Sequence, residues 1–168
     1  MISSTAIKIF VRAIAFGGTA VFSIALMNSL PRIRQERQRS FAEATLDGNL
    51  GRMRWLHLSG AKVDARSNLG SPLFLAAGEG KLDAVRYLLD EGANVNASEV
   101  KGHTALAEAA YYGHVNVVKE LLLHGADINA VSDEGTALDI AIGRKNTVVA
   151  DLLRHRGGRS ASEIRSGG

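Results

Sequence analysis

A six-residue phrase, Gly-Ala-x-aliphatic-Asx-Ala, occurs three times in this chain, at residues 60–65, 92–97 and 125–130. Its copies begin 32 and 33 residues apart, and the pair Gly157-Gly158 marks a degraded fourth start after a further 32 residues. A fixed period in this range is typical of a stacked repeat array, in which each unit contacts only its neighbours. The period therefore predicts a solenoid. It also favours a binding function, because a solenoid presents an extended surface.

Each period is predicted to form two short antiparallel helices and a protruding loop. In the fullest unit, the Thr104 hydroxyl can cap the first helix and Gly113 can end it in a left-handed conformation. Gly125 ends the second helix in the same way. Residues 127–135, rich in Asn, Asp, Ser and Gly, are interpreted as a turn or hairpin. Helices this short are marginal alone, so the fold requires that neighbouring units cover each apolar face.

Equivalent positions in the four units carry matching apolar residues. The first helices supply a column of large apolar residues and a column of alanines, and the second helices supply a column of leucines. We expect all three columns to be buried, with the alanines letting paired helices approach closely. The columns are Phe41, Leu73, Leu106, Leu138; Ala44, Ala76, Ala109, Ala141; and Leu56, Leu88, Leu121, Leu153.

The units resemble the ankyrin repeat family, whose motif runs Gly-x-Thr-Pro-Leu-His-x-Ala-Ala-x-x-Gly-His, followed by Val-Val, Leu-Leu and Gly-Ala-Asp-Val-Asn-Ala. The resemblance covers residues 39–157 as four units, with bounds 39–65, 66–97, 98–130 and 131–157. It implies an all-α fold, an ankyrin-type α-solenoid of stacked helix-turn-helix units with protruding hairpin loops.

The chain departs from that motif in two ways. No unit keeps the histidine of Thr-Pro-Leu-His, which in the family ties the hairpin to the helix, and we expect Thr136 with Asp139 to form a capping-box-like substitute. Gly70 and Gly135 directly precede Ser71 and Thr136. Two hairpins are therefore predicted to be one residue shorter than the family norm.

The resemblance also implies where a partner binds: on the hairpin tips and on the exposed positions after the Ala-Ala pair of each first helix. Tyr111 and Tyr112 stand out because tyrosine is enriched in interface hot spots. The alternative is that one of the two packs on a neighbouring unit. Trp55 and Tyr87, at equivalent positions of the second helices, are interpreted as packing residues. The candidate partner-binding residues are Tyr111, Tyr112, Arg144, Glu79, Asp47, Lys101, His103, Asn68 and Glu134.

No pattern in the sequence predicts catalysis. The five histidines form no His-x-x-x-His pair, the chain has no cysteine, and motifs for a nucleophilic serine, a phosphate-binding loop or a dinucleotide site are missing. His114 matches the Gly-His turn of the family motif and is expected to be structural. We therefore expect no enzymatic activity, no catalytic residues, no metal site, no cofactor and no small-molecule substrate.

The net charge of +3 hides an uneven distribution. Residues 1–40 carry a net charge of +5, residues 41–153 one of −5, and the last fifteen residues one of +3. An acidic body between two basic ends argues against nucleic acid as a partner. Residues 158–168 are small and polar, and they are expected to be disordered.

Residues 13–30 contain no charged side chain and would span about 27 Å as a helix, close to the thickness of a bilayer core. They are interpreted as a single-pass membrane anchor between a short basic N-terminus, residues 1–12, and an Arg-rich linker, residues 31–38. The alternatives are a signal peptide cleaved near Ala25, an organellar presequence or a buried helix. If the segment is an anchor, four arginines after it, against Lys8 and Arg12 before it, favour a cytoplasmic location for the repeats.

These features predict a membrane-tethered protein-protein interaction module, an adaptor or scaffold without catalytic activity, whose partner is another protein. The alternative is an exported protein, periplasmic or secreted, that binds a partner after cleavage near Ala25. A third hypothesis is an accessory subunit that holds a membrane enzyme complex.

Overall fold

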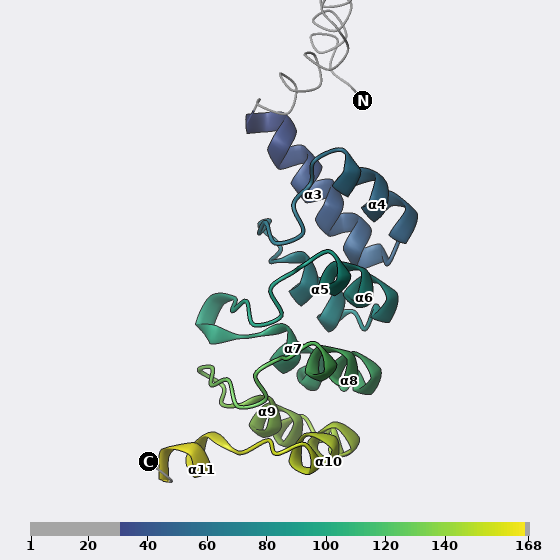
Figure 1. Cartoon of the computed structure of the whole chain (residues 1–168). Helices are drawn as coiled ribbons and strands as arrows, with labels where there is room; N and C mark the ends of the chain where they lie inside the picture. Colours follow the sequence, from purple (N-terminus) through teal and green to yellow (C-terminus); the bar gives the residue numbers. More distant parts are fainter. Residues whose placement is uncertain (1–30, 167–168) are drawn as a thin grey trace, which may run out of the picture. The chain divides into compact units, whose positions relative to one another are not determined.

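The chain divides into two parts, residues 1–37 and residues 38–168. The repeat units lie in the second part. The structure is a computed structural model, and it describes residues 31–166 (Figure 1). The predicted anchor or signal segment, residues 13–30, lies outside the described residues. Among the helices within residues 31–166, none is both long and apolar enough to cross a bilayer.

Within residues 31–166, four helix pairs follow one another. The first helices are α3 (Pro31–Asp47), α5 (Pro72–Gly78), α7 (Ala105–Tyr112) and α9 (Ala137–Gly143). The second helices are α4 (Leu50–Leu58), α6 (Leu82–Asp90), α8 (Val115–Leu123) and α10 (Thr147–His155). A 3-10 turn, η1 (Val100–Gly102), lies in one hairpin, and a short helix, α11 (Ala161–Ser166), follows the last pair.

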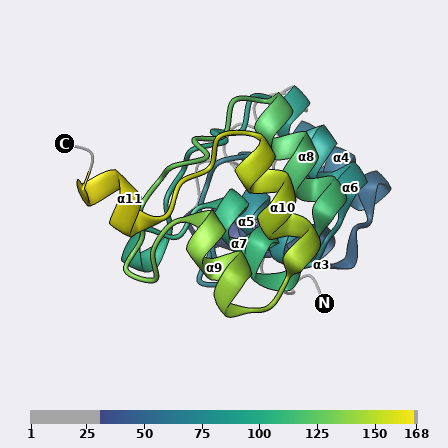
Figure 2. The same cartoon turned by 90° about the horizontal axis from the view of Figure 1, so that it is seen from below.

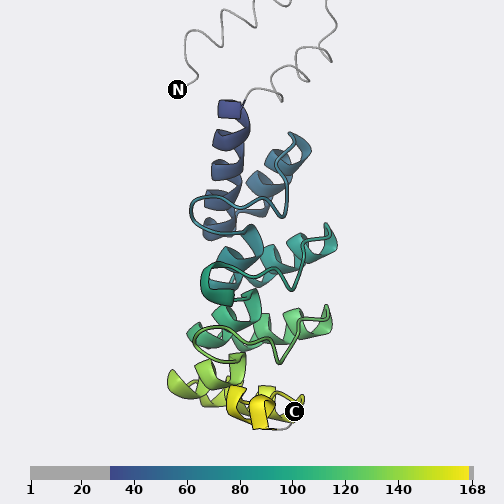
Figure 3. The same cartoon turned by 90° about the vertical axis from the view of Figure 1, so that its left-hand side faces the viewer.

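The pairs within residues 38–166 stack in chain order. Helix α7 packs between α5 and α9, and α8 packs between α6 and α10. In Figure 2 the second helices lie on one side of the first helices and the hairpin loops lie on the other. Figure 3 shows these loops at successive levels of the stack. The predicted all-α, ankyrin-type solenoid is confirmed.

The three predicted columns form the core. Every one of their twelve residues is buried, and the four alanines are completely covered. Alanine has no side-chain bulk beyond Cβ, so the first helices of adjacent units approach closely, while leucine fills the space between the second helices. Burial of each leucine contributes about 1.5–3 kcal/mol relative to leaving it in water.

The Asx residue of the repeat phrase joins each unit to the next. The Asp64 carboxylate accepts a hydrogen bond from the backbone N–H of Asn94 at 2.9 Å, and the Asn96 side chain accepts one from the N–H of Asp127 at 2.8 Å. Asn129 accepts one from the N–H of Arg159 at 2.8 Å. The side-chain oxygen of each Asx residue thus pairs with a backbone donor about thirty residues further along. This contact explains why the Asx residue recurs once in each repeat.

The hairpins differ in width as predicted. Short antiparallel bridges join Ser67 to Gly70 and Ser132 to Gly135, whereas a wider one joins Ser98 to Thr104. The two short hairpins are those in which glycine directly precedes the helix cap. The prediction of two shortened hairpins is confirmed.

The first helices begin with three different caps. Thr136 and Asp139 form a capping box, as predicted, and the Thr104 hydroxyl accepts a hydrogen bond from the N–H of Ala107 at 3.2 Å. The Ser71 side chain makes no capping bond. Instead, the Glu99 carboxylate of the following hairpin accepts a hydrogen bond from the Ser71 N–H at 3.0 Å. A carboxylate therefore joins this hairpin to the preceding helix.

The predicted linker, residues 31–38, is helical. Helix α3 begins at Pro31, a residue suited to the first helical turn because its missing N–H would be unpaired there in any case. Further along, Gln38 donates hydrogen bonds to the carbonyls of Lys62 and Ala65 at 2.7 and 3.0 Å and accepts one from the Lys62 N–H. The first unit therefore begins before residue 39, and Gln38 holds its loop.

The prediction of disorder over residues 158–168 needs correcting. The N–H of Ala161 donates to the Asp139 carboxylate at 2.7 Å, and the Thr136 hydroxyl donates to the carbonyl of Arg159 at 2.9 Å. Ala161 is buried, and residues Ala161–Ser166 form α11. Polar composition suggested disorder, but an acceptor, Asp139, and a donor, Thr136, on the last unit bind the backbone of this segment and order it.

Candidate protein-binding surface

The exposed positions after the Ala-Ala pairs occur at the same place in each unit. Asp47, Glu79, Tyr112 and Arg144 are all exposed, at or just after the ends of α3, α5, α7 and α9. Because the units stack in register, these four residues follow one another from unit to unit. The charge along the row changes from carboxylate in the first two units to guanidinium in the last.

Two aromatic rings and an arginine meet in the third and fourth units. The rings of Tyr111 and Tyr112 pack edge to face with centroids 4.9 Å apart. The guanidinium carbon of Arg144 lies 3.5 Å from the centroid of the Tyr111 ring, an arrangement in which the cation is attracted by the ring face. Tyr112 also stacks on His114, with centroids 6.1 Å apart and an interplanar angle of 25°. We name Tyr111, Tyr112 and Arg144 the tyrosine–arginine cluster.

The two tyrosines have different surroundings. Tyr111 is half-buried beneath Arg144 of the next unit, whereas 56% of the Tyr112 surface is exposed. One ring therefore packs on a neighbouring unit, and the other presents its surface to solvent.

Three of the predicted hairpin residues lie where the sequence placed them. Asn68, Lys101 and Glu134 are exposed in successive hairpins. Val100, beside Lys101, was missed although 79% of its surface is exposed. An apolar residue inside an otherwise polar turn is the signal that would have indicated it, because nothing in a hairpin tip buries such a side chain.

His103 does not lie at an exposed tip, and the prediction of its position is wrong. Only 9% of its surface is exposed. Its Nδ1 atom lies 3.5 Å from a Glu108 carboxylate oxygen, and its Nε2 atom lies 3.8 Å from one of Glu134, on the next hairpin. His103 is covered because these two units stack against one another. It lies between Glu108 of its own unit and Glu134 of the next.

Glu108 lies beside His103 and has a perturbed pKa. Burial raises the pKa of the Glu108 carboxyl, the hydrogen bond and charge interaction with His103 oppose the rise, and the nearby Glu134 carboxylate adds to it. The net pKa is raised because burial outweighs the contribution of His103.

Salt bridges and hydrogen bonds also join the first two hairpins. Arg66 pairs with the Glu99 carboxylate at 3.0 Å and donates to the carbonyl of Ser98. Glu99 is therefore bound by Arg66 on one side and by the Ser71 N–H on the other. Side-chain contacts between neighbouring units therefore hold the hairpin side of the stack in one arrangement.

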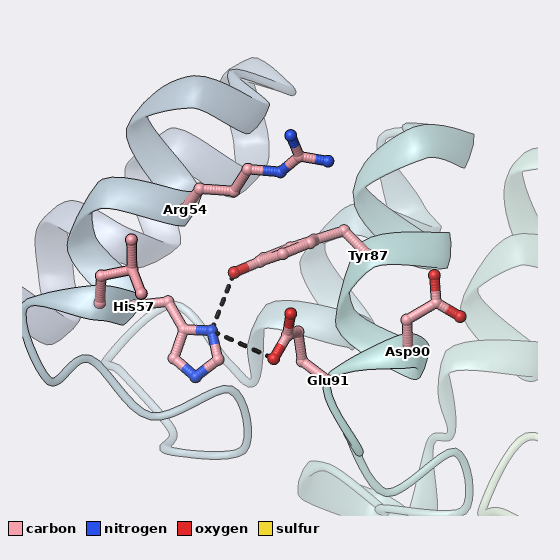
Figure 4. A pocket seen from close by; sticks show the side chains of 6 residues that line it. Arg54, His57, Tyr87, Asp90 and Glu91 are labelled. Carbon is pink, nitrogen blue, oxygen red and sulfur yellow. Dashed lines mark hydrogen bonds and ion pairs between the residues drawn. The ribbon is translucent and has the colours of Figure 1, made fainter.

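A concavity lies between α4 and α6 (Figure 4). This open pocket of about 440 Å³ is lined by Arg54, His57, Leu58, Tyr87, Asp90 and Glu91. His57 Nδ1 lies 2.8 Å from the Tyr87 hydroxyl and 3.6 Å from a Glu91 carboxylate oxygen. Within the pocket, His57 therefore contacts both Tyr87 and Glu91.

The polar side chains of the α4–α6 pocket connect the first two units, through the contact between His57 and Tyr87. Burial raises the pKa of the Tyr87 hydroxyl, the Glu91 charge raises it further, and Arg54 opposes the rise. Tyr87 therefore stays protonated at neutral pH and can donate a hydrogen bond to His57. Within residues 31–166, no three His, Cys, Asp or Glu side chains converge to hold a metal ion.

Trp55 and Tyr87 occupy equivalent positions but do not behave alike. Tyr87 packs edge to face on His57 of the preceding unit, as its interpretation as a packing residue implies. Trp55 is 66% exposed, so its interpretation as a packing residue is wrong. The reason is its place in the first unit, where no preceding second helix among the described residues covers it.

The repeat geometry and the sequence motif together define the class of protein. The family model of ankyrin repeats in three copies matches residues 41–132, more than half of the chain. The chain belongs to the ankyrin repeat family, whose repeats generally bind other proteins.

The chain is similar to parts of several longer proteins. An ankyrin repeat-containing protein of Treponema pallidum (strain Nichols) is 33% identical over 133 residues, which cover 77% of this chain and 45% of that protein. An ankyrin repeat and KH domain-containing protein of Caenorhabditis briggsae is 40% identical over 74% of this chain and 5% of its own length. The serine/threonine-protein kinase TNNI3K of Mus musculus is 38% identical over 44% of this chain and 10% of its own. The matched regions thus make up less than half of each relative.

Proposed function

We propose that this chain is a non-catalytic adaptor that binds another protein on its hairpin and first-helix surface, with the tyrosine–arginine cluster as the main contact. The observation that carries the proposal is the exposure of Tyr112 beside a Tyr111 ring that Arg144 already covers. Tyrosine and arginine are the residue types enriched in interface hot spots. Because the rings are held by one another and by His114, binding requires little loss of side-chain entropy.

The charges around the cluster indicate how a partner would be oriented. Glu79 lies one unit before the two tyrosines and Arg144 of the cluster lies one unit after them, and both are exposed. A partner segment that carries a cation toward Glu79 and a carboxylate toward Arg144 would complement both, and such pairing mainly sets orientation and association rate.

We propose further that residues 13–30 anchor the adaptor in a membrane with the repeats on the cytoplasmic side. The support is a run of eighteen residues without charge, followed by four arginines. The competing hypothesis of export rests on the small-x-small site Ser23-Ile24-Ala25. N-terminal sequencing of the mature protein distinguishes the two, because an anchored chain keeps residues 13–30 and an exported one begins near residue 26.

The binding proposal is tested by replacing Tyr111 and Tyr112 together by Ala in the full-length chain. Partner binding should weaken by about 2–4 kcal/mol, which is about thirty-fold to several hundred-fold in dissociation constant. The measurement is affinity capture from membranes, followed by titration of the captured protein. Tyr112→Ala alone should reduce capture with little change in melting temperature, because its ring is mostly exposed.

The matched control is Leu123→Ala, which removes a 73% exposed apolar side chain from α8 on the opposite side of the first helices. It should leave capture unchanged. If the double tyrosine variant captures its partner normally but melts much earlier than the wild type, the two rings belong to the core and the proposal fails.

A further inference from the structure

We propose that the exposed face of α4, formed by Arg52, Arg54, Trp55 and Leu58, rests on the headgroups of an anionic lipid bilayer. We call these four residues the α4 face. The proposal rests on the membrane anchor proposed above in one respect, since that anchor brings the first unit to a bilayer. It names a second contact with the membrane, made by the repeat domain itself.

The α4 face combines exposed apolar residues with cations. Trp55 is 66% exposed and Leu58 is 89% exposed. Arg52 and Arg54 are exposed on the same helix. Among the four second helices that the structure describes, α4 alone contains no acidic residue.

Equivalent positions in later units show why this face is open. Arg52 occupies the position of Ala84, Val117 and Val149, and all three of those are buried against their neighbours. Trp55 occupies the position of Tyr87, which instead bonds to the preceding unit. Helix α4 is the first of the second helices within the described residues (Figure 1), so no preceding second helix covers Arg52 and Trp55 there.

The charges on and around the face decide which partner fits it. Arg52 lies 3.6 Å from the Glu43 carboxylate, which Arg39 also binds, and the Arg54 guanidinium carbon lies 5.8 Å from the Tyr87 ring centroid (Figure 4). Two arginines share one carboxylate, so the first unit keeps positive charge available to phosphate oxygens. Asp90 and Glu91 of the next unit line the α4–α6 pocket beside Arg54 and Leu58, and their repulsion from an anionic surface limits the contact to the first unit.

This combination of residues matches the boundary between bilayer and water. Tryptophan is enriched at that depth, leucine enters the edge of the acyl chains, and arginine binds lipid phosphates. The uncharged segment 13–30 directly precedes α3, the helix paired with α4. If that segment is an anchor, the first unit is the repeat unit closest in the sequence to the membrane.

Trp55 is the only tryptophan in the chain, so its fluorescence reports on this face alone. The full-length chain is reconstituted into vesicles of phosphatidylcholine with phosphatidylserine and, separately, into vesicles of phosphatidylcholine alone. In the anionic vesicles we expect a blue-shifted emission that brominated lipids quench and that high salt reverses. In the zwitterionic vesicles the emission should stay close to its value in water.

Charge variants test the role of the arginines. Arg52→Gln with Arg54→Gln should abolish the shift in anionic vesicles. The matched control is Lys119→Gln with Arg154→Gln, which removes two exposed cations from later second helices and should leave the shift intact. Unchanged melting temperatures of both variants establish that folding is preserved.

The outcomes separate this inference from the proposed anchor. A chain that floats with anionic vesicles while Trp55 emits as in water overturns the bilayer contact and leaves the anchor standing. A chain that does not associate with vesicles overturns both. A shift of equal size in both lipid mixtures, growing with protein density, means that a second copy covers Trp55 and also overturns the proposal.

Discussion

His114 and Asn146 each connect one repeat to the preceding one through a single polar side chain. His114 Nε2 donates a hydrogen bond to the carbonyl of Gly78 at 2.8 Å. Asn146 Nδ2 donates to the carbonyls of Ala110 and Tyr111, both at 2.8 Å. These carbonyls lie at the ends of α5 and α7, where no further helical turn can satisfy them. The expected structural role of His114 is therefore confirmed, and Asn146 performs the same role one unit later.

Because Gly80 lies against His114, replacing Gly80 by Ala should destabilise the fold more than replacing Gly92 by Ala. Gly80 has a φ angle of +66°, and a Cβ atom there would lie 2.7 Å from the His114 ring. Gly92 has a similar φ of +85° but nothing within 4 Å of its Cβ position. Gly92→Ala should cost about 1 kcal/mol for the left-handed backbone alone, and Gly80→Ala about 2–3 kcal/mol, because the displaced ring also loses its hydrogen bond.

Urea denaturation of both glycine variants measures the two free energies of unfolding. Gly92→Ala serves as the control, since it has the same backbone strain without the steric contact. Equal losses for the two variants would mean that the His114 ring moves aside without cost and is not an important connection between the repeats.

Helix α9 and helix α11 depend on one carboxylate. Asp139 accepts hydrogen bonds from the Thr136 N–H and from the Ala161 N–H. Burial by itself raises the pKa of the Asp139 carboxyl, but these hydrogen bonds, together with the Thr136 hydroxyl and the Arg165 charge, outweigh it and leave the pKa below its ordinary value. The capping box of α9 is therefore also the docking site of α11.

The lowered pKa of Asp139 fixes the pH dependence of this connection. A carboxyl whose pKa is lower in the folded state contributes stability above its unfolded pKa, about 4, and loses it as the pH falls through the folded pKa. Asp139→Ala should therefore cost about 1–2 kcal/mol at neutral pH. The difference from wild type should shrink in acid, where the wild type loses the same contribution.

Thermal or urea unfolding across the acid range tests this prediction. Asp133→Ala is the matched control because Asp133 is an exposed acid in the adjoining hairpin, and its removal should change stability little at any pH. A loss from Asp139→Ala that persists at full size in strong acid would show that the cap stabilises the fold without its charge.

In a linear array, the stability of each unit depends on how many neighbours it has. Helices α7 and α8 of the third unit each pack between two neighbouring helices of the same row, whereas α9 and α10 belong to the last pair. Total stability is then approximately a sum of unit terms and interface terms. A destabilising change in the middle of the stack should therefore affect more units than a change of the same size near the end.

Leu121 and Leu153 test this expectation because both are completely buried leucines at equivalent positions. Each change to Ala should cost about 2–5 kcal/mol locally. Leu121→Ala should increase hydrogen exchange on both sides of the third unit, whereas Leu153→Ala should increase it mainly in α9, α10 and α11. Identical exchange across all helices in both variants would indicate a single cooperative block.

Much of the fold could be predicted because the determining contacts repeat with the sequence period. The buried columns, the helix ends, the capping box of Thr136 and Asp139 and the two short hairpins all follow from residue types at fixed positions within a unit. Even the Asx of the repeat phrase recurs because each copy, such as Asn96, meets the same backbone donor of the next unit.

The candidate surface could be predicted only in part, because exposure depends on what the neighbouring unit supplies. The sequence alone indicated Tyr112, Lys101 and Asn68 as surface residues, since their positions in the motif face solvent. Only the tertiary structure showed His103 buried between Glu108 and Glu134, Tyr111 covered by Arg144 and Trp55 left open on the first unit. A local pattern determines which way a side chain points within its own unit, whereas its burial is decided by a stacking partner roughly thirty residues away, or by the lack of one within the described chain.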